Sequence, residues 1–566
     1  MPRLRRIGLP LLLAMAAMIG GSGLPPAARG GAADRLPDLR MAPLTQFRTE
    51  FSGGQRRVRF STIMTNEGAG PLEVRGWRNN LSEQHLQTQQ RIYNTAGGSR
   101  LAASRALMEY ARDGHDHWHI QGVMLYQLWA DSGLVRRGAK VGFCFLDSTA
   151  WRLSLPGAPQ LPRYFMSSCG DTGDLQNRMG LSVGWGDHYP ANFAFQWIDI
   201  TGLPPGDYTV QAKADEQNWY LESNETNNCA WARVRVQAGN GPLSVLSSGR
   251  TCLAPPASTA RVERQYGDDR YQTAAAVSED AFAAGVPVAY VATGANFPDA
   301  LAAGAAAGFK GGPVVLVEKF KLPALAVTEL ERLNPQRIVI VGGTGVISQY
   351  VASLVARFHT GGGATRIAGS DRYATAATIS AATFAGGTVD TAYVASGRDW
   401  ADALAAVPHA ARSGGPVLLT LPTEVPGRLQ QELIRLRPHR IIVVGGPGVV
   451  SDGVLAALDA FDTGGGVLRI GGADRYATAA ALSAFHFPGG ATFAYVATGA
   501  NFPDALAAGP AAAIRGAPTL LVRAPAIPPS TATELARLNP GRIYVLGGPN
   551  VISGAVQAQL GTYVGP

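Results

Sequence analysis

The chain has 566 residues, 46% of them hydrophobic and 16% charged, and a formal net charge of +8. This length predicts several domains and excludes a single small core. Residues 261–566 carry 23 Lys and Arg against 21 Asp and Glu, so the charge is weak support for an anionic partner, and no nucleic-acid partner is expected.

The first 33 residues are interpreted as a secretory signal peptide. "MPRLRRIGLPLLLAMAAMIGG" joins a basic head to a short apolar run, and a stretch rich in proline and small residues follows. The apolar run is short for a membrane span, although an N-terminal membrane anchor is the alternative. In either case the rest of the chain faces outward, and the protein is expected to be secreted.

Residues 34–253 have the pattern of an all-β domain. Short stretches rich in β-branched and aromatic residues, bounded by Gly, Pro, Asn and Asp, predict strands within 56–68, 122–131, 193–200 and 206–215. A β-sandwich is the expected architecture.

Three of the nine histidines, His115, His117 and His119, lie within five residues. On a strand, side chains at alternate positions point to one face, roughly 7 Å apart at the Cβ atoms. The imidazoles would therefore form a row on one side of a sheet. Imidazole suits copper, zinc, iron or nickel, so the row predicts a transition-metal site and leaves the metal open.

The four cysteines all lie in the first half of the chain. Export makes disulfide formation possible. A count of four does not fix the connectivity, but proximity along the chain favours Cys144 with Cys169 and Cys229 with Cys252.

The region from "LPDL" near residue 36 to Cys252 resembles the catalytic domain of the lysyl oxidase family. "GHDHWH", "GAKVGFCFLD", "GLSVGWGDHYPANFAFQWIDITGLPPGDYTV" and "LESNETNN" follow one another in the family's order. The resemblance implies that copper sits on the three histidines and that a lysine tyrosylquinone cofactor forms from Lys140 and Tyr189. Both residues stand at the motif positions, Tyr189 eight residues before Trp197.

The chemistry that this resemblance implies is the oxidation of a primary amine or peptidyl lysine to an aldehyde. Molecular oxygen is consumed, and ammonia and hydrogen peroxide are released. Copper would be needed to make the quinone from Tyr189. Asp187 and His188 adjoin Tyr189 and are candidates for the base on proximity alone, and His188 could equally be a surface residue.

Two departures from the animal members limit what can be transferred. Positions that hold cysteines there hold Gly114, Trp185 and Phe195 here, and the histidine just upstream of the row corresponds to Arg112. No metal ligand or cofactor precursor is lost, but substrate preference cannot be inherited across these changes.

A possible calcium site is the second feature that the resemblance implies. Animal relatives use the segment matching "ESNETNN", together with the aspartate of an early "PDL", to bind calcium, and clustered oxygen ligands suit such a hard cation. Asn224 replaces an acidic residue, which predicts a lower affinity, and an Asn-rich hairpin turn is the alternative. The candidate ligands are Asp38, Glu222, Asn224, Asn227 and Asn228.

Three copies of one module fill the chain after residue 260. Blocks such as "GSDRYATAA", "NFPDALAAG" and "VVGGPGVVS" recur 102 or 103 residues apart, within 262–361, 362–465 and 466–566. Apolar runs ending in glycine alternate with Ala-rich stretches, which indicates α/β units with buried parallel strands. Nucleotide binding is disfavoured because the G-x-G-x-x-G spacing and an acidic ribose partner are missing.

These copies resemble the cell wall binding repeat type 2 family of Gram-positive surface proteins. The resemblance implies three modules in a pseudo-threefold arrangement that hold an anionic secondary cell wall polymer. Arg270, Arg372 and Arg475 are the candidate polymer contacts, since a fixed guanidinium suits phosphate or carboxylate. The alternative is that each arginine pairs with the aspartate before it and caps a helix.

The sequence thus predicts an exported amine oxidase, dependent on copper and a quinone, at the cell wall or surface of a Gram-positive-type bacterium. A linker at 254–261 would join it to the three repeats. The alternative is a noncatalytic metal-binding or adhesion protein, which would not need Lys140 and Tyr189 to approach each other beside the histidines. A zinc hydrolase ranks lower because no Glu base adjoins the histidines.

Overall fold

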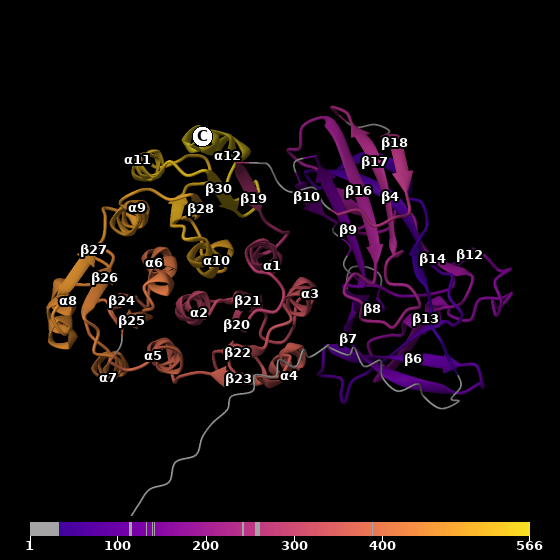
Figure 1. Ribbon diagram of the computed structural model, residues 1–566, viewed down its shortest axis with the longest axis horizontal. Coiled ribbons are helices and arrows are strands. Elements are labelled where there is room, and N and C mark those ends of the chain that lie inside the picture. Colours follow the sequence, from indigo (N-terminus) through magenta and orange to yellow (C-terminus); the bar gives the residue numbers. More distant parts are fainter. Residues whose placement is uncertain are drawn as a thin grey trace, which may run out of the picture.

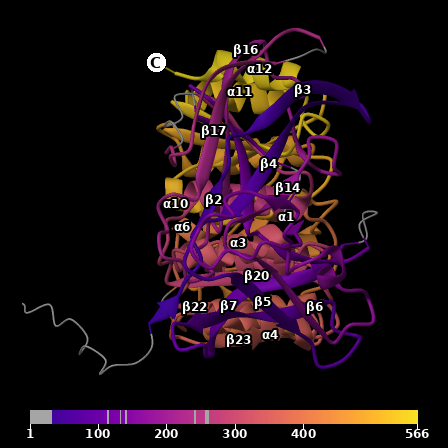
Figure 2. The ribbon, with the colours of Figure 1, turned by 90° about the vertical axis from the view of Figure 1, so that its right-hand side faces the viewer.

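The computed structural model describes residues 33–111, 116–131, 133–138, 140, 142–239, 243–254, 261–387 and 389–565. A sheet-rich unit ends at residue 254, and a helix-rich unit built from the repeats lies beside it (Figure 1, Figure 2). Within these ranges no helix has the length and apolar character needed to cross a membrane.

The sheet-rich unit contains three antiparallel sheets. The first has seven strands: β1 (Asp34–Arg35), β5 (Leu72–Trp77), β6 (His85–Asn94), β7 (Ser99–Tyr110), β8 (Trp118–Gln121), β11 (Gly142–Phe143) and β13 (Gln176–Leu181). The second has five: β9 (Met124–Ala130), β10 (Gly133–Arg137), β16 (Gly206–Ala214), β17 (Cys229–Val236) and β18 (Ser244–Gly249). The third has six: β2 (Leu39–Met41), β3 (Thr45–Ser52), β4 (Gln55–Asn66), β12 (Thr149–Ala150), β14 (Trp185–Tyr189) and β15 (Trp197–Asp199).

Three of the four stretches predicted as strands form strands along most of their length, namely β4, β9 and β16. The prediction for 193–200 was wrong over its first half, because only the second half forms a strand, β15. Phe195 has φ of 58°, in the left-handed region that interrupts a strand. The backbone therefore turns just before β15.

A chain of aromatic rings joins the three sheets in the core. Phe60 of β4 meets Tyr126 of β9 at 5.1 Å between ring centroids, and Tyr126 meets Phe143 of β11 at 6.0 Å. Phe143 then packs edge-on against Tyr189 of β14 at 4.9 Å. Edge-to-face contacts of this kind fix ring orientation as well as burying area. The third sheet thus presents Tyr189 to the first.

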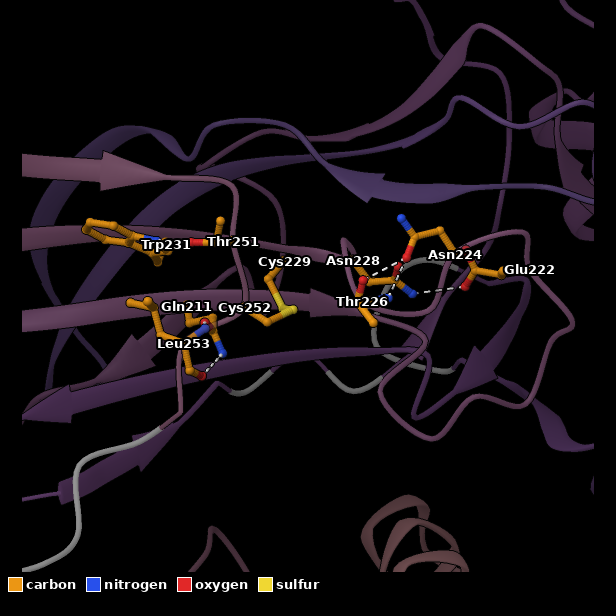
Figure 3. Close-up of a disulfide and its surroundings, with 10 residues drawn as sticks. All are labelled: Gln211, Glu222, Asn224, Thr226, Asn228, Cys229, Trp231, Thr251, Cys252 and Leu253. Atoms are coloured by element: carbon orange, nitrogen blue, oxygen red, sulfur yellow. Dashed lines mark hydrogen bonds between the residues drawn. A yellow bond between two sulfur atoms is a disulfide. The ribbon is translucent and has the colours of Figure 1, made fainter. Parts of the chain in front are cut away.

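Both predicted disulfides are confirmed. Cys144 follows β11 and pairs with Cys169 at the end of the 3-10 helix η1 (Met166–Cys169). Cys229 begins β17 and pairs with Cys252, beyond β18 (Figure 3). The Leu253 amide donates to Gln211 Oε1 of β16 at 2.8 Å, so the chain leaves this unit fastened to two strands.

Each repeat contributes four α-helices and a parallel sheet. The first copy holds α1 (Arg270–Ala281), α2 (Pro298–Phe309), α3 (Ala324–Leu333), α4 (Gln349–Val355) and η2 (Ala356–Phe358). The second holds α5 (Arg372–Thr383), α6 (Ala401–Arg412), α7 (Gly427–Leu436), α8 (Asp452–Leu458) and η3 (Asp459–Phe461). The third holds α9 (Arg475–His486), η4 (Pro503–Ala505), α10 (Ala508–Arg515), α11 (Pro529–Leu538), α12 (Gly554–Leu560) and η5 (Gly561–Tyr563).

Three strands of each parallel sheet are buried, as the apolar runs predict, and each sheet takes a fourth, mostly half-buried strand from the neighbouring copy. The first sheet contains β20 (Val288–Thr293), β21 (Val314–Val317), β22 (Arg337–Val341) and β23 (Ala364–Ile367). The second contains β24 (Thr391–Ser396), β25 (Val417–Thr420), β26 (Arg440–Val444) and β27 (Val467–Ile470). The third contains β28 (Phe493–Thr498), β29 (Thr519–Val522), β30 (Arg542–Leu546) and β19 (Val262–Gln265), which closes the exchange between the last copy and the first.

Helices α2, α6 and α10 pack against one another in the middle of the repeat unit (Figure 1). Small residues bring their backbones close: a Cβ on Gly304 would lie 2.9 Å from Val407 Cγ1, and one on Gly509 would lie 2.3 Å from the same atom. Such approaches leave no room for a side chain, which explains the Gly- and Ala-rich sequence of these helices.

Candidate active site

His117 and His119 converge at the start of β8. Their Nε2 atoms lie 3.0 Å apart and their ring centroids 4.7 Å apart. The strand begins only at Trp118, because Asp116 has φ of 47° and the Ala111 amide donates to the His117 carbonyl, so the expectation of one extended strand across the row was wrong. His115 lies outside the described residues.

Lys140 and Tyr189 meet beside this pair. Lys140 Nζ lies 5.2 Å from the centroid of the Tyr189 ring and 5.0 Å from that of Phe143. Lys140 is 4% exposed and Tyr189 is 7% exposed. Gly142, two residues after Lys140, lies directly against His119, because a Cβ on Gly142 would be 2.9 Å from the Cβ of His119. The two residues assigned to the quinone thus approach each other next to the two described histidines.

The Tyr189 phenol is held by the disulfide-bonded segment after β11. Its hydroxyl donates to the Cys144 carbonyl at 2.8 Å, and its ring packs edge-on against Phe193 at 6.4 Å as well as against Phe143. Burial and the neighbouring Asp187 carboxyl raise the pKa of Tyr189 well above its usual value. The phenol is therefore kept neutral in this enclosed position.

Asp187 lies on the same side of β14 as Tyr189, because residues two apart on a strand share a face. Burial raises the pKa of Asp187 to about 8, although a hydrogen bond with Tyr189 and the charge of Lys140 oppose that rise. His188 points to the other face and is half-buried. Of the two candidate bases, only Asp187 adjoins Tyr189 on its own side of the strand.

A cleft of about 740 Å³ opens over this site. From the sheet-rich unit it is lined by Arg78, Glu83, Glu109, Trp118, His119 and Lys140, and the first repeat contributes Asp269, Gln272, Glu318 and Lys321. Sequence reasoning missed Glu109, although it faces His119 across the β7–β8 pair. The hairpin register could have revealed Glu109, and comparison of the three copies could have revealed Gln272, Glu318 and Lys321, which occur only in the first.

Two of the positions that depart from the animal pattern are among the described residues, and one of them lies at the cleft. Phe195 lines the cleft and is 39% exposed. Trp185 is buried and donates from Nε1 to the Pro159 carbonyl at 2.9 Å. Arg112 and Gly114 lie outside the described residues. The two described positions have thus been filled by aromatic side chains in place of cysteines.

Most of the predicted calcium ligands gather beside the Cys229–Cys252 disulfide. Asn228 donates to Glu222 Oε1 at 3.0 Å (Figure 3). Asn227 donates to Asp38 at 2.9 Å. The Oδ1 atoms of both asparagines are buried without a hydrogen-bond partner among the described residues. Asn224 is exposed and bonds instead to Thr226 within its own turn.

Two acidic residues that the sequence did not single out complete this cluster. Asp215, Glu222 and Glu225 each offer a carboxylate oxygen, and these atoms all lie within 4.8 Å of one another. Burial raises the pKa of Asp215 to about 7 and that of Glu222 to about 9, and repulsion within the cluster adds to both. Buried like charges and orphaned oxygens are an arrangement that a hard cation would stabilise.

The three repeated arginines occupy equivalent positions between copies. Asp269, Asp371 and Asp474 cap the helices, each accepting from a backbone amide at 2.8 or 2.9 Å. The arginines themselves donate to glycine carbonyls and lie over aromatic rings of another copy: Arg270 over Phe502, Arg372 over Phe297 and Arg475 over Trp400. The helix-capping alternative thus holds for the aspartates but not for the arginines.

Comparison with known proteins gives matches for both halves. The N-acetylmuramoyl-L-alanine amidase LytC of Bacillus subtilis (strain 168) is 28% identical over 299 residues, 53% of this chain and 58% of the relative. Lysyl oxidase homolog 1 of Homo sapiens is 32% identical over 117 residues, 20% of this chain and 18% of the relative. The chain therefore covers less than two thirds of either relative.

Among solved structures, Cwp6 from Clostridium difficile shares the fold alone, at 16% identity and a TM-score of 0.50 over 94% of this chain and 68% of that one. The family model for lysyl oxidase matches residues 61–242, and that for cell wall binding domain 2 matches residues 264–352, 366–455 and 469–557. Both resemblances are confirmed: the chain carries a lysyl oxidase domain followed by three cell wall binding domain 2 repeats.

Proposed function

We propose that the protein is an amine oxidase of lysyl oxidase type that three repeats hold at a bacterial cell wall. The observation that carries this proposal is the approach of Lys140 to the Tyr189 ring, 5.2 Å away, beside the paired histidines. A noncatalytic metal-binding domain would need the histidines alone. It gives no reason for a buried lysine to sit against a buried tyrosine.

The histidine pair fits a transition metal. Ligand nitrogens lie about 2.0–2.1 Å from a metal ion, so two of them on adjacent coordination positions are separated by roughly 3 Å. The Nε2 atoms of His117 and His119 already have that separation. His117, His119 and His115 are thus the proposed copper ligands, and copper would serve to convert Tyr189 into the quinone.

A lysine tyrosylquinone made from Lys140 and Tyr189 would supply the carbonyl that oxidises a primary amine to an aldehyde, with molecular oxygen as the final oxidant. The chain's own residues would prepare that chemistry. Cys144 and Phe143 fix the Tyr189 ring, and the buried setting excludes water. Asp187 is the proposed base: with a pKa of about 8, its carboxyl ionises as the pH rises toward 8 and can then take a proton from the substrate's α-carbon.

The test is peroxide release by the secreted, copper-loaded protein with a panel of primary amines. Lys140→Arg and Tyr189→Phe should each abolish peroxide and the coloured phenylhydrazine adduct of the quinone. His188→Gln, a change on the opposite face of β14, is the matched control and should retain both. A copper-loaded parent that gives neither peroxide nor adduct would leave the metal-binding alternative in place.

The repeats are proposed to bind an anionic secondary cell wall polymer and to locate the protein at the surface of a Gram-positive-type bacterium. The cell wall binding domain 2 matches and the three repeated arginines support this role. The role in wall binding would be tested by loss of wall retention in an Arg270, Arg372 and Arg475 triple alanine variant.

The proposed arrangements of the two units are also supported. The mutual packing of α2, α6 and α10 agrees with a pseudo-threefold arrangement of the repeats. The antiparallel sheets agree with a β-sandwich in the sheet-rich unit.

A further inference from the structure

The cleft over the candidate active site is built by two different units of the chain. Its sheet-rich side carries His119 and Lys140, and its other side comes from the first repeat. Its volume of about 740 Å³ falls within the range typical of small-molecule sites, about 300–1,000 Å³. A substrate that reaches Lys140 through this cleft therefore passes residues of a wall-binding module.

The first repeat is attached to the sheet-rich unit by contacts that its sister copies do not make. Glu279 of α1 pairs with Arg137, and the same positions in α5 and α9 hold Ala381 and Ala484. Glu331 of α3 pairs with Arg105 at 3.0 Å. The matching residues of α7 and α11, Ile434 and Ala536, cannot form an ion pair.

Two further contacts between the first repeat and the sheet-rich unit are also made by residues that the other two copies lack. The Tyr350 hydroxyl of α4 accepts from the His85 amide at 3.0 Å and lies 3.1 Å from its carbonyl, and Gly453 and Ala555 stand at the matching positions. Arg357 donates to the Ser104 carbonyl at 2.7 Å, where the other copies hold Ala460 and Thr562. The first copy thus carries residues of its own that attach it to the sheet-rich unit.

The turn between β21 and α3 shows the same specialisation where it lines the cleft. It reads "EKFKLP" in the first copy, against "LPTEVP" after β25 and "RAPAIP" after β29. Its Lys321 crosses to Glu109, the residue that faces His119, at 2.5 Å. Gln272 of α1 also lines the cleft, where α5 and α9 hold Ala374 and Ala477.

Glu318 is the carboxylate of this turn that is left for a ligand. Lys321 neutralises Glu109, Asp269 caps α1, and Glu83 accepts from Asn79. Glu318 is half-buried at the cleft and forms no ion pair with any described residue. An amine must be uncharged to attack a carbonyl, so this carboxylate would attract a different, positively charged group of the substrate.

We propose that the first cell wall binding repeat forms one side of the amine-oxidase substrate site and that its Glu318 selects amines carrying a second positive charge. This inference rests on the proposed function. The substrate class is then a diamine, or a lysine side chain with a cationic neighbour, and the repeat acts in specificity as well as in attachment.

The test compares 1,5-diaminopentane with pentylamine in the copper-loaded full chain by peroxide release. Glu318→Gln should raise the KM for the diamine about three- to tenfold, change its kcat little, and leave pentylamine unaffected, as expected for loss of one partly exposed charge contact. Glu318→Lys should raise the diamine KM further. Glu424→Gln, the same change in the matching turn of the second repeat, is the control and should behave as the parent.

A second readout does not depend on turnover: titration calorimetry of the copper-free full chain with 1,5-diaminopentane should show the same loss of affinity in Glu318→Gln. Peroxide from the parent with KM values that Glu318→Gln leaves unchanged, or changes equally for both amines, would overturn this inference alone. No peroxide from the parent with either amine would overturn the proposed function and this inference with it.

Discussion

Tyr189 is fixed by groups from two separate segments of the chain. The Cys144 carbonyl holds its hydroxyl, and Phe143 and Phe193 pack against its ring. Cys144 is in turn tied to Cys169. A phenol that must meet one lysine needs this kind of support, because a freely rotating ring would present its carbons at random.

Asp187 should act as the base and His188 should not. Asp187→Asn keeps the size of the side chain but cannot accept the proton, so turnover should fall by about 10²–10⁴-fold. The phenylhydrazine adduct should persist, since Lys140 and Tyr189 remain. His188→Asn, made on the opposite face of β14, should stay close to the parent, and an equal loss in both variants would count against the assignment.

Calcium should stabilise the sheet-rich unit through the cluster of Asp215, Glu222 and Glu225. At a hundred times its Kd, a ligand adds about 2.7 kcal/mol. For a unit of this size that corresponds to a rise in Tm of roughly 5–10 °C, which calorimetry with calcium and with a chelator would measure.

Two variants sharpen this prediction. Glu222→Gln removes a ligand of the cluster and should abolish the calcium-dependent part of the Tm. Asn224→Ala should lower the Tm slightly through its lost turn contacts to Thr226 but keep the calcium response. If Asn224→Ala abolished the response instead, the cation would sit elsewhere in the segment.

At the residue scale, the sequence predicts those sites whose residues lie close together along the chain. The histidine row and the cysteine pairs follow from local patterns, whereas Lys140 and Tyr189 are identified through the resemblance to the lysyl oxidase family. Asp215 lies seven residues before Glu222, in a different motif, and only the folding of β16 against β17 brings them together. Glu109 likewise becomes visible only through strand register.

Between α6 and α9, a histidine pair joins the second copy of the repeat to the third. His409 and His486 stack at 4.4 Å between ring centroids, and His486 Nε2 lies 3.1 Å from the Tyr393 hydroxyl. Arg412 and the Phe487 ring complete their surroundings. Burial and then the charge of Arg412 lower the pKa of His486 to about 4. Burial, then His486 and then Arg412 hold the pKa of His409 well below its ordinary value.

The repeat unit should therefore lose stability in mild acid. Unfolding returns both histidines to a pKa near 6.5, so between pH 6.5 and pH 4 the unfolded chain binds more protons than the folded one, and stability falls as the pH falls. Denaturant unfolding followed across this range should show the decline.

The histidine pair can be separated from other acid effects by substitution. His409→Phe removes the buried imidazole while keeping a flat ring against Phe487, and it should flatten the pH dependence. His439→Phe, made at an exposed site of the same copy, should leave it unchanged. A decline of equal size in His409→Phe would assign the acid sensitivity to other groups.

The elements of the repeats could be predicted, but the membership of their sheets could not. Aspartate caps and alternating apolar and Ala-rich stretches indicate the helices and strands correctly. The exchange of β19, β23 and β27 between copies depends on how the copies pack, which no local pattern encodes. Repeat boundaries drawn from the sequence therefore cut through each sheet.

For the molecule as a whole, the two units should be one rigid body as long as the first repeat keeps its ion pairs. Glu279→Arg with Glu331→Arg would place like charges against Arg137 and Arg105. Each reversal replaces an attraction of about 0.2–1 kcal/mol by a repulsion of similar size. Small-angle scattering should show a larger radius of gyration, and the KM for 1,5-diaminopentane should rise.

The matching control reverses two charges of the second copy, away from the contact with the sheet-rich unit. Glu424→Arg with Asp459→Arg changes the net charge equally in the second copy, where both residues are exposed. It should scatter as the parent does. If the Glu279 and Glu331 variant also kept the parent's radius of gyration, these ion pairs would not be what holds the two units together.

The disulfide between Cys229 and Cys252 also sets the mechanical path through the molecule. If the repeats are held at a wall, as proposed, and the contacts of the first repeat have given way, tension along the chain reaches the sheet-rich unit at Cys252, the last cysteine before the repeats. It then crosses the disulfide directly to Cys229 at the start of β17. The hairpin of β17 and β18, residues 230–251, is bypassed and carries no tension. In the reduced protein the same pull would peel β18 from its sheet first.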